Sequence, residues 1–299
     1  MYFITYIHDN TEEIGIVLKQ QKRIFPMKEV FKYIDMNCPE TMNDFIDIAA
    51  DNLIKDIKGV LNDGKLKGIP EEDVKLSAPI PYPRRNIICL GKNYIDHAKE
   101  TRGIPGGTDD IPKSPIYFSK IAAPAISDGD IILNHSEITD MVDYEVELAV
   151  IIGKDGINIK AQEAEEHIFG YTIVNDVSAR DVQMKHGQWF KGKSLKTHCP
   201  MGPYIAHKTL IPFPIELDIT CKVNNEIRQN SNTKNLIFDI PYIISDLSKG
   251  MGLRAGDIII TGTPAGVGLG FNPCKYLRPG DKVECYIEKI GTLTNMVEE

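Results

Sequence analysis

The chain has 299 residues, 42% hydrophobic and 25% charged, with a net charge of −8 and a pI of about 5.5. This length allows one large domain or two, and the acidic balance argues against nucleic acid or an anionic membrane surface as a partner. The six cysteines are scattered without a CxxC pair, which indicates reduced thiols in a cytoplasmic protein, and no signal peptide or membrane span is predicted.

The beginning of the chain predicts a β-hairpin followed by a helix. Residues 2–7 and 14–19 have strand-like patterns on either side of the polar turn HDNTEE. Residues 41–62 then place apolar side chains at helical spacing, and Thr41 with Asp44 resembles a capping box at the start. These elements together indicate a small α+β unit.

A proline-rich stretch divides the chain. SAPIPYPRRN, residues 77–86, keeps the backbone extended, because proline fixes its own φ and restricts the residue before it. We therefore expect a small N-terminal α+β domain at residues 1–75 and a larger domain at residues 76–299.

The larger domain is predicted to be dominated by strands. Its apolar runs are short and are separated by Gly, Pro and Asp, whereas helical spacing is rare. One helix is expected at residues 235–249, and a second is expected to start with Ser178 as its N-cap and Asp181 at N3. This order of elements predicts a strand-dominated α+β fold and argues against a Rossmann layout.

The run VDYEVELAVIIGK, residues 142–154, carries two glutamates in an apolar strand pattern. In a strand, Glu145 and Glu147 share one face, roughly 6–7 Å apart at a rise of about 3.3 Å per residue. The Ala-Val-Ile-Ile run that follows is typical of a strand buried on both sides, where two unpaired like charges are costly. Either this face is solvated or a positive group lies between the two carboxylates.

A third carboxylate, Asp176, ends the strand-like run FGYTIVND, so it can face a cleft at a strand end. Three carboxylate ligands without a Cys or His cluster suit a hard cation, Mg²⁺, Mn²⁺ or Ca²⁺, better than zinc. The alternative is that Glu145 and Glu147 are exposed and that Asp176 only caps a turn. Residue spacing alone favours this alternative.

Three further side chains are candidates for acid–base chemistry. Lys193, in the run QWFKGKSLKTHC, can supply a fixed positive charge or a proton to a developing enolate. His97 and Glu100, in GKNYIDHAKE, share one helical face, where the carboxylate can orient the imidazole as a base. The alternatives are a surface lysine and a surface ion pair.

The densest glycine cluster is TGTPAGVG, residues 261–268. It matches neither the GxGxxG pattern nor the P-loop pattern, so a nucleotide-binding interpretation is weak. A glycine-rich backbone with a free threonine hydroxyl can approach a small anion closely, and a tight turn between strands is the alternative.

Together these segments strongly resemble the fumarylacetoacetate hydrolase family, in particular its shorter bacterial and mitochondrial members of the acylpyruvase or 2-hydroxyhepta-2,4-diene-1,7-dioate isomerase type. The matching segments, in chain order, are NIICLGKNYIDHAKE, PIYFSK, DYEVELAVIIGK, GYTIVNDVSARDVQ, QWFKGKS, CPMGP and AGDIIITGTPAGVG. They span about residues 86–268, and LRPGDKVECYIEKIGTL extends the likeness nearly to the C-terminus. So many motifs in one order argue against a chance similarity.

The resemblance implies a role for each candidate residue. The positions that match the family's metal ligands, usually filled with Mg²⁺ or Mn²⁺, are Glu145, Glu147 and Asp176. The positions that match its catalytic groups are Lys193 and the water-activating pair His97 and Glu100. The positions that match substrate-pocket residues are Lys120, Arg180, Gln183 and Thr263. The implied fold is the family's β-sandwich roll, and the implied assembly is a homodimer.

The implied activity is metal-dependent hydrolysis of a C–C bond in an acylpyruvate or related diketo acid, such as fumarylpyruvate, through an enolate. The same enolate serves oxaloacetate decarboxylation or tautomerisation and isomerisation of 2-hydroxy-diene diacids, which are the alternatives. A metal-stabilised binding protein without catalysis is an alternative of another class. Two positions depart from the family pattern, because Lys196 replaces an acid and His198 replaces an aromatic residue. If these side chains face the site, they favour a more anionic substrate.

Overall fold

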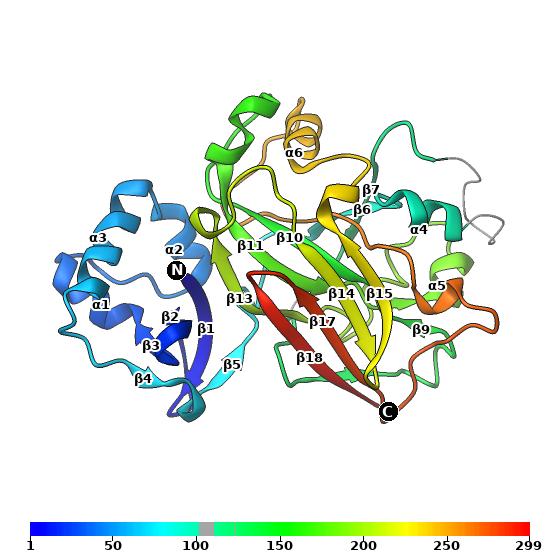
Figure 1. The fold of residues 1–299 in the computed structure, drawn as a ribbon, viewed down its shortest axis with the longest axis horizontal. Coiled ribbons are helices and arrows are strands. Elements are labelled where there is room, and N and C mark those ends of the chain that lie inside the picture. The colour runs from blue at the N-terminus through cyan, green and yellow to red at the C-terminus, as the bar shows by residue number, and fades with distance from the viewer. Residues whose placement is uncertain (102–110, 123) are drawn as a thin grey trace.

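The computed structural model describes residues 1–101, 111–122 and 124–299, and most of its strands form two sheets (Figure 1). Within these residues, an 11-stranded sheet has the order β4 (Ile69–Pro70), β3 (Arg23–Pro26), β2 (Thr11–Leu18), β1 (Tyr2–His8), β13 (Met201–His207), β11 (Ile168–Asn175), β10 (Val146–Ile152), β16 (Ile258–Ile260), β6 (Ile87–Gly91) and β7 (Ile116–Lys120), with β5 (Lys75–Ser77) paired to β1. No helix in the described part of the chain is long and apolar enough to cross a bilayer.

The second sheet of the described chain has five strands, in the order β15 (Glu226–Asn232), β14 (Asp218–Val223), β17 (Lys282–Ile287), β18 (Gly291–Glu298) and β8 (Ile131–Leu133). A separate short pair joins β9 (Val142–Asp143) and β12 (Ser178–Ala179). The α-helices are α1 (Met27–Ile34), α2 (Met42–Ile48), α3 (Asp51–Asn62), α4 (Ile95–Glu100), α5 (Arg180–Lys185) and α6 (Ile240–Ser248). Short 3-10 helices cover Lys19–Gln21, Glu71–Asp73, Ala161–His167, Lys208–Leu210, Thr233–Asn235 and Gly268–Gly270. The strand-dominated α+β class is confirmed.

The largest hydrophobic core lies between the two sheets. The strands β10 and β11 pair antiparallel in the large sheet, and every residue of both strands is buried. Leu148 and Val150 of β10 belong to one hydrophobic cluster with Ile219, Val283 and Leu293 of the five-stranded sheet. This packing of one sheet on the other is the β-sandwich that the resemblance implied.

The N-terminal unit, residues 1–75, is joined to the rest of the fold by a continuous sheet (Figure 1). Strand β1 pairs with β2 on one side and with β13 on the other, so the large sheet crosses the predicted boundary. A second hydrophobic cluster likewise combines Phe3 and Phe45 of this unit with Phe169 and Ile205. The division into two domains stays a prediction, because the two parts share a sheet and a core.

The N-terminal hairpin forms with a shorter turn than its sequence suggested. Strand β2 begins at Thr11, so the turn consists of Asp9 and Asn10 instead of the six residues HDNTEE. Both turn residues have positive φ, 50° and 61°. Asp and Asn tolerate this conformation, which suits a two-residue hairpin turn.

The helix predicted at residues 41–62 is divided into α2 and α3. The chain leaves helical dihedral angles at Ala49 and Ala50, although neither alanine is a helix breaker. The helix propensity of these two residues therefore does not account for the break. The predicted cap is confirmed, because Thr41 Oγ1 accepts a hydrogen bond from the Asp44 backbone N–H at 3.2 Å.

Two later helices begin after their predicted starts. Helix α6, predicted to start at residue 235, begins after Asp239, whose side chain accepts from the Tyr242 backbone N–H at 2.8 Å. Helix α5 has Ala179 as its N-cap. The predicted cap Ser178 lies in β12 instead, where its hydroxyl donates to the Asp176 carbonyl at 2.8 Å. This local hydrogen bond competes with the capping geometry.

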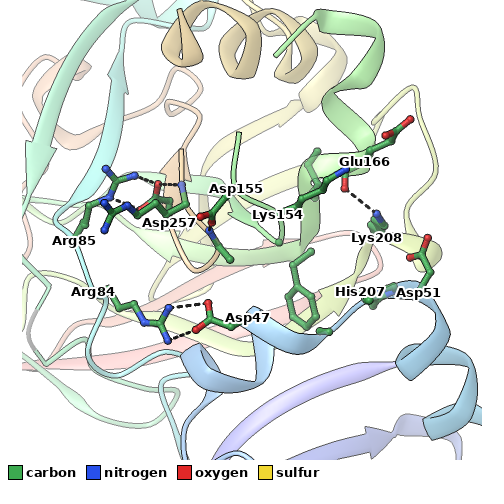
Figure 2. Close-up of a pocket in the computed structure, with 17 residues that line it drawn as sticks. Asp47, Asp51, Arg84, Arg85, Lys154, Asp155, Glu166, His207, Lys208 and Asp257 are labelled. Atoms are coloured by element: carbon green, nitrogen blue, oxygen red, sulfur yellow. Dashed lines mark hydrogen bonds and ion pairs between the residues drawn. The ribbon is translucent and has the colours of Figure 1, made fainter. Parts of the chain in front are cut away.

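Two consecutive arginines of the extended junction line a cleft of about 1160 Å³ (Figure 2). Arg84 forms two hydrogen bonds of 2.7 Å with Asp47 of α2. Arg85 donates to Asp257 through Nε at 2.7 Å and also through Nη2. The two partners differ in burial, because the side chain of Asp47 is 41% exposed and that of Asp257 is 4% exposed.

We expect Arg85→Ala to destabilise the fold more than Arg84→Ala. Loss of Arg85 leaves a buried carboxylate without its cation, which costs about 1–3 kcal/mol, whereas an exposed ion pair contributes about 0–1 kcal/mol. Urea denaturation of the wild type and both variants, followed by circular dichroism, measures the difference. Equal losses would contradict this explanation, because the adjacent arginines differ mainly in the burial of their partners.

Candidate active site

Three carboxylates meet where β10 begins and β11 ends. Glu145 directly precedes β10, Glu147 lies in it, and the antiparallel register places Asp176 beside them, with its backbone N–H 2.9 Å from the Glu145 carbonyl. One oxygen of each carboxylate lies within 4.8 Å of the others. All three residues are buried, so the alternative of two exposed glutamates is wrong.

Positive charge lies among these carboxylates, which is one of the two alternatives that the strand pattern left open. The Lys193 ammonium group is 2.5 Å from Glu145 Oε2 and 2.8 Å from Asp176 Oδ2. Lys120 approaches the other oxygen of Asp176 at 2.5 Å and also donates to the Val177 carbonyl. Both lysines are buried, so the surface-lysine alternative for Lys193 is wrong.

The two glutamates titrate differently because their neighbours differ. Burial alone would raise the pKa of Glu145, but Lys193 and Arg180 outweigh it and lower this pKa to about 2. Burial, reinforced by the charges of Asp176 and Glu145, raises the pKa of Glu147 well above its usual range. For Lys193, burial opposes the charged form, yet the carboxylates of Asp176 and Glu145 prevail and raise its pKa. These two carboxylates therefore favour the ammonium form of Lys193.

Arg180 and Gln183, which are three residues apart, share a face of α5. Arg180 Nη1 donates to Gln183 Oε1 at 3.1 Å, and Nε donates to Asp143 Oδ2 at 2.8 Å. Nη2 lies 2.7 Å from Glu145 Oε1, in an ion pair without an aligned hydrogen bond. Every nitrogen of this buried guanidinium thus faces a protein group, which indicates that Arg180 holds the site together.

The predicted His–Glu pair forms on α4. His97 Nδ1 lies 3.2 Å from Glu100 Oε2, and the second oxygen of Glu100 accepts from the Gly266 backbone N–H at 2.9 Å. His97 is buried, so the pair is not a surface ion pair. Because an ionised carboxylate only accepts, Nδ1 carries the hydrogen and Nε2 is left as the basic nitrogen.

The glycine-rich loop binds carboxylates of the protein itself. Its backbone N–H groups at Gly262, Gly266 and Gly268 donate to Glu147, Glu100 and Asp143 at 2.6, 2.9 and 2.6 Å. The predicted capacity for anions is present, but side chains occupy these donors. At Gly266, φ is +103° and an added Cβ would lie 1.9 Å from a carbonyl oxygen, so only glycine fits.

A cavity of about 110 Å³ lies against these groups. The predicted site residues that line it are His97, Glu145, Glu147, Arg180, Gln183, Lys193 and Thr263. The hydroxyl of Thr263 donates to the Val146 carbonyl at 3.0 Å and accepts from Gln229 at 2.6 Å. The other predicted residues, Lys120, Glu100 and Asp176, lie behind the cavity wall and hold lining residues or one another.

The apolar wall of the cavity was not found from the sequence. It includes Met184, Leu269, Phe118 and Trp189, and the last two rings meet with centroids 5.1 Å apart. Trp189 packs against Gly91, where an added Cβ would lie 2.3 Å from a ring atom. The available signal was the single tryptophan of the chain, within the motif QWFKGKS.

The two departures from the family pattern do not face the cavity. Lys196 is exposed, and neither it nor His198 is a lining residue. His198 is fully buried with Nε2 3.0 Å from the Leu133 carbonyl, and burial, helped by Lys120, lowers its pKa to about 3. His198 is therefore neutral. Because neither side chain lines the cavity, the condition under which they would favour a more anionic substrate is not met.

The three clustered carboxylates could hold a divalent cation. The three carboxylates are buried and offer only oxygen donors. The Lys193 ammonium lies between Glu145 and Asp176, so this site accommodates positive charge. Oxygen donors of this kind suit Mg²⁺ or Mn²⁺. The cavity places the acid–base groups Lys193 and His97 at the same site. This arrangement can bind a small acid and move a proton on it.

Comparison with known proteins gives a consistent picture. Residues 86–298 match the family described as "Fumarylacetoacetate (FAA) hydrolase C-terminal". The chain is similar to oxaloacetate tautomerase YisK of Bacillus subtilis, with 53% identity over 225 residues that cover 75% of this chain and 73% of the relative. It is also similar to the structure of a fumarylacetoacetate hydrolase from Exiguobacterium antarcticum, with a TM-score of 0.83, 35% identity, and coverage of 100% and 99% of the two chains. A maleylpyruvate hydrolase from Sphingobium sp. SYK-6, in complex with manganese(II) and pyruvate, matches with a TM-score of 0.77, 27% identity, and coverage of 100% and 99%.

Proposed function

Because this chain belongs to the fumarylacetoacetate hydrolase family, we propose that it is a divalent-metal-dependent enzyme that interconverts the keto and enol forms of a short 2-oxo dicarboxylic acid such as oxaloacetate. The cavity carries the proposal, because about 110 Å³ beside the carboxylate cluster is small against the roughly 300–1,000 Å³ of ligand sites for larger molecules. The sequence alone put hydrolysis first. The cavity size and the name of the relative YisK favour tautomerisation.

The cation would be held by Glu145, Glu147 and Asp176. The manganese ion in the maleylpyruvate hydrolase structure supports Mn²⁺ or Mg²⁺ for this place. When bound, such an ion supplies Lewis acidity toward a carbonyl oxygen. The remaining chemistry belongs to the side chains of the protein.

Lys193 and His97 have different roles in the proposed reaction, because Lys193 stabilises the developing oxyanion and His97 moves the proton. The Lys193 ammonium, which the carboxylates of Asp176 and Glu145 keep charged in spite of burial, donates a hydrogen bond to the 2-oxo oxygen where negative charge develops. His97 accepts a proton from C3 of the keto form through Nε2, while Glu100 holds Nδ1. This leaves an enolate and a protonated His97. The proton on His97 then passes to the 2-oxo oxygen, which completes the enol, or returns to C3, which restores the keto form. The apolar wall at Phe118 and Trp189 limits water near these groups.

The test is a rate measurement on the purified protein with Mn²⁺. Decay of the enol absorbance of oxaloacetate is expected to exceed the uncatalysed rate, to return to that rate in EDTA, and to recover when Mn²⁺ is added back. Fumarylacetoacetate, a longer acid, should be turned over poorly because it exceeds the cavity. No acceleration, or acceleration that EDTA leaves intact, would rule the proposed function out.

Hydrolysis of a short acylpyruvate is the second candidate. The pair formed by the buried His97 and the half-buried Glu100 favours it, because hydrolysis needs an activated water. Acetylpyruvate in the same assay distinguishes the two, since hydrolysis releases acetate and pyruvate, whereas tautomerisation releases nothing. Faster turnover of acetylpyruvate than of oxaloacetate would reverse the order of the two candidates.

The affinity for Mn²⁺ is expected to rise with pH. Burial and the neighbouring Asp176 and Glu145 raise the pKa of Glu147, so below that pKa its carboxyl carries a proton that a cation must displace. As pH falls, protons compete and binding weakens; as pH rises, the carboxylate forms and binding strengthens. Isothermal titration calorimetry in buffers of different ionisation enthalpy measures both the affinity and the protons released. Binding that is independent of pH and releases no proton would contradict this reasoning.

A further inference from the structure

Asp143 is a fully buried carboxylate that is not among the residues lining the cavity. Its Oδ1 accepts from the backbone N–H groups of Tyr144 at 2.9 Å and Gly268 at 2.6 Å. Its Oδ2 accepts from Arg180 Nε at 2.8 Å and from the Leu269 backbone N–H at 3.0 Å. Four donors on two oxygens fix the orientation of this carboxylate. The reaction proposed above uses none of these contacts directly.

One of these contacts fixes the guanidinium of Arg180. A guanidinium is planar and only donates, so holding Nε on Asp143 sets the directions of Nη1 and Nη2. Nη2 then lies 2.7 Å from Glu145 Oε1, within the carboxylate cluster. Nη1 donates to Gln183 Oε1 at 3.1 Å. Because arginine cannot accept, Gln183 must present its oxygen there, and its NH2 group is left to donate in the cavity that Gln183 lines.

The backbone contacts of Asp143 fix the glycine-rich loop. Gly268 packs so closely that an added Cβ would lie 2.7 Å from Asp143 Oδ1. The next residue, Leu269, lines the cavity, and Gly266 of the same loop donates to Glu100 at 2.9 Å. One carboxylate therefore orients both the α5 side and the loop side of the cavity.

We propose that Asp143 is a positioning residue for the divalent-cation site, acting through Arg180 on Glu145. The inference rests on the proposed function in that Glu145 is taken as a metal ligand. Groups that orient ligands without touching the metal commonly change affinity or activity by about 10- to 100-fold when they are removed. A purely structural role predicts a loss of stability with no change in metal affinity.

Asp143→Asn tests the proposal, because the amide keeps the shape but its NH2 group cannot accept from Arg180 or the backbone. Asp257→Asn is the matched control. Asp257 is also buried, also accepts from an arginine Nε and from a backbone N–H, each at 2.7 Å, and lies outside the site. Calorimetry without substrate measures Mn²⁺ affinity, and urea denaturation measures stability. We expect about 10- to 100-fold weaker binding in Asp143→Asn and unchanged binding in Asp257→Asn, with both variants less stable.

Equal Mn²⁺ affinities in Asp143→Asn and the wild type would overturn the proposal. If Asp143→Asn does not fold, Arg180→Lys replaces it, since lysine keeps the charge but cannot reach Asp143, Gln183 and Glu145 together. Arg180→Lys should weaken Mn²⁺ binding by about 10- to 100-fold, as expected for Asp143→Asn. An Arg180→Lys variant with the Mn²⁺ affinity of the wild type would also overturn the proposal. If the wild type binds Mn²⁺ but does not accelerate oxaloacetate tautomerisation, the proposed function is refuted and the inference about Asp143 is not. The two results are independent, because calorimetry without substrate measures binding and not turnover.

Discussion

Replacing Lys193 with methionine is expected to lower kcat by about 100- to 1,000-fold, the usual loss when one preorganised donor to a developing oxyanion is removed. The same change should destabilise the metal-free protein, because it leaves Glu145 and Asp176 buried without their shared cation. Removing one partner of a buried ion pair costs about 3–5 kcal/mol. Added Mn²⁺ should restore stability, since it supplies positive charge, but should not restore turnover. Thermal denaturation with and without Mn²⁺, together with the enol decay assay, measures both effects.

Lys120→Met is the matched control for this experiment. Lys120 contacts the same Asp176 and is equally buried, but it does not line the cavity. We expect a similar loss of stability with a much smaller loss of kcat. Equal losses of kcat in the two variants would show that charge balance around Asp176, and not a contact of Lys193 with substrate, supports the reaction.

Replacing His97 with alanine is expected to lower kcat for tautomerisation by about 100- to 10,000-fold, the range for a positioned acid–base group. Glu100→Gln should be nearly as damaging. The Gly266 N–H requires an acceptor, so the glutamine oxygen stays there and its NH2 group faces His97 Nδ1. The imidazole must then accept at Nδ1 and carry its hydrogen on Nε2, which removes the base from the cavity. Single-turnover decay of enol oxaloacetate measures both variants.

Asp96→Asn controls for changes in the helix itself. Asp96 lies on the same short helix, is exposed, and only approaches Lys99 at 3.7 Å. Its replacement should leave kcat within about twofold, because an exposed ion pair contributes little. Full activity of Glu100→Gln would contradict the tautomer argument. Loss of acylpyruvate hydrolysis with intact oxaloacetate tautomerisation in His97→Ala would show that this residue activates only water.

The candidate site could be recognised from the sequence through the order of its motifs more than through any single spacing. The alternation around Glu145 and Glu147 placed both on one face, but the same alternation describes an exposed pair. What distinguishes the two cases is the position of Lys193 between Glu145 and Asp176, which depends on folding that no local pattern records. The resemblance supplied this long-range information.

The other features that the sequence did not predict depend on contacts between segments that are distant in the chain. Ala49 and Ala50 interrupt a sequence with uninterrupted helical periodicity, although the propensity of alanine favours a continuous helix. Asp143 was not singled out in the sequence, because its four hydrogen bonds come from three separate segments. Lys196 and His198 were noted because they depart from the family pattern, but the direction of a side chain relative to a cavity is not encoded in that pattern.

The pairing of β1 with β13 has a consequence for any shortened form of the protein. Without residues 1–75, β13 would become the edge of the sheet, and the Ile205 and Ala206 backbone that faces Phe3 and Tyr2 would lose its partner. An unpaired apolar strand edge is a template for pairing with another chain. We therefore expect removal of the N-terminal unit to promote aggregation through β13, even where the acid–base groups of the site are unaffected. The N-terminal unit thus covers the β13 edge and prevents another chain from pairing with it.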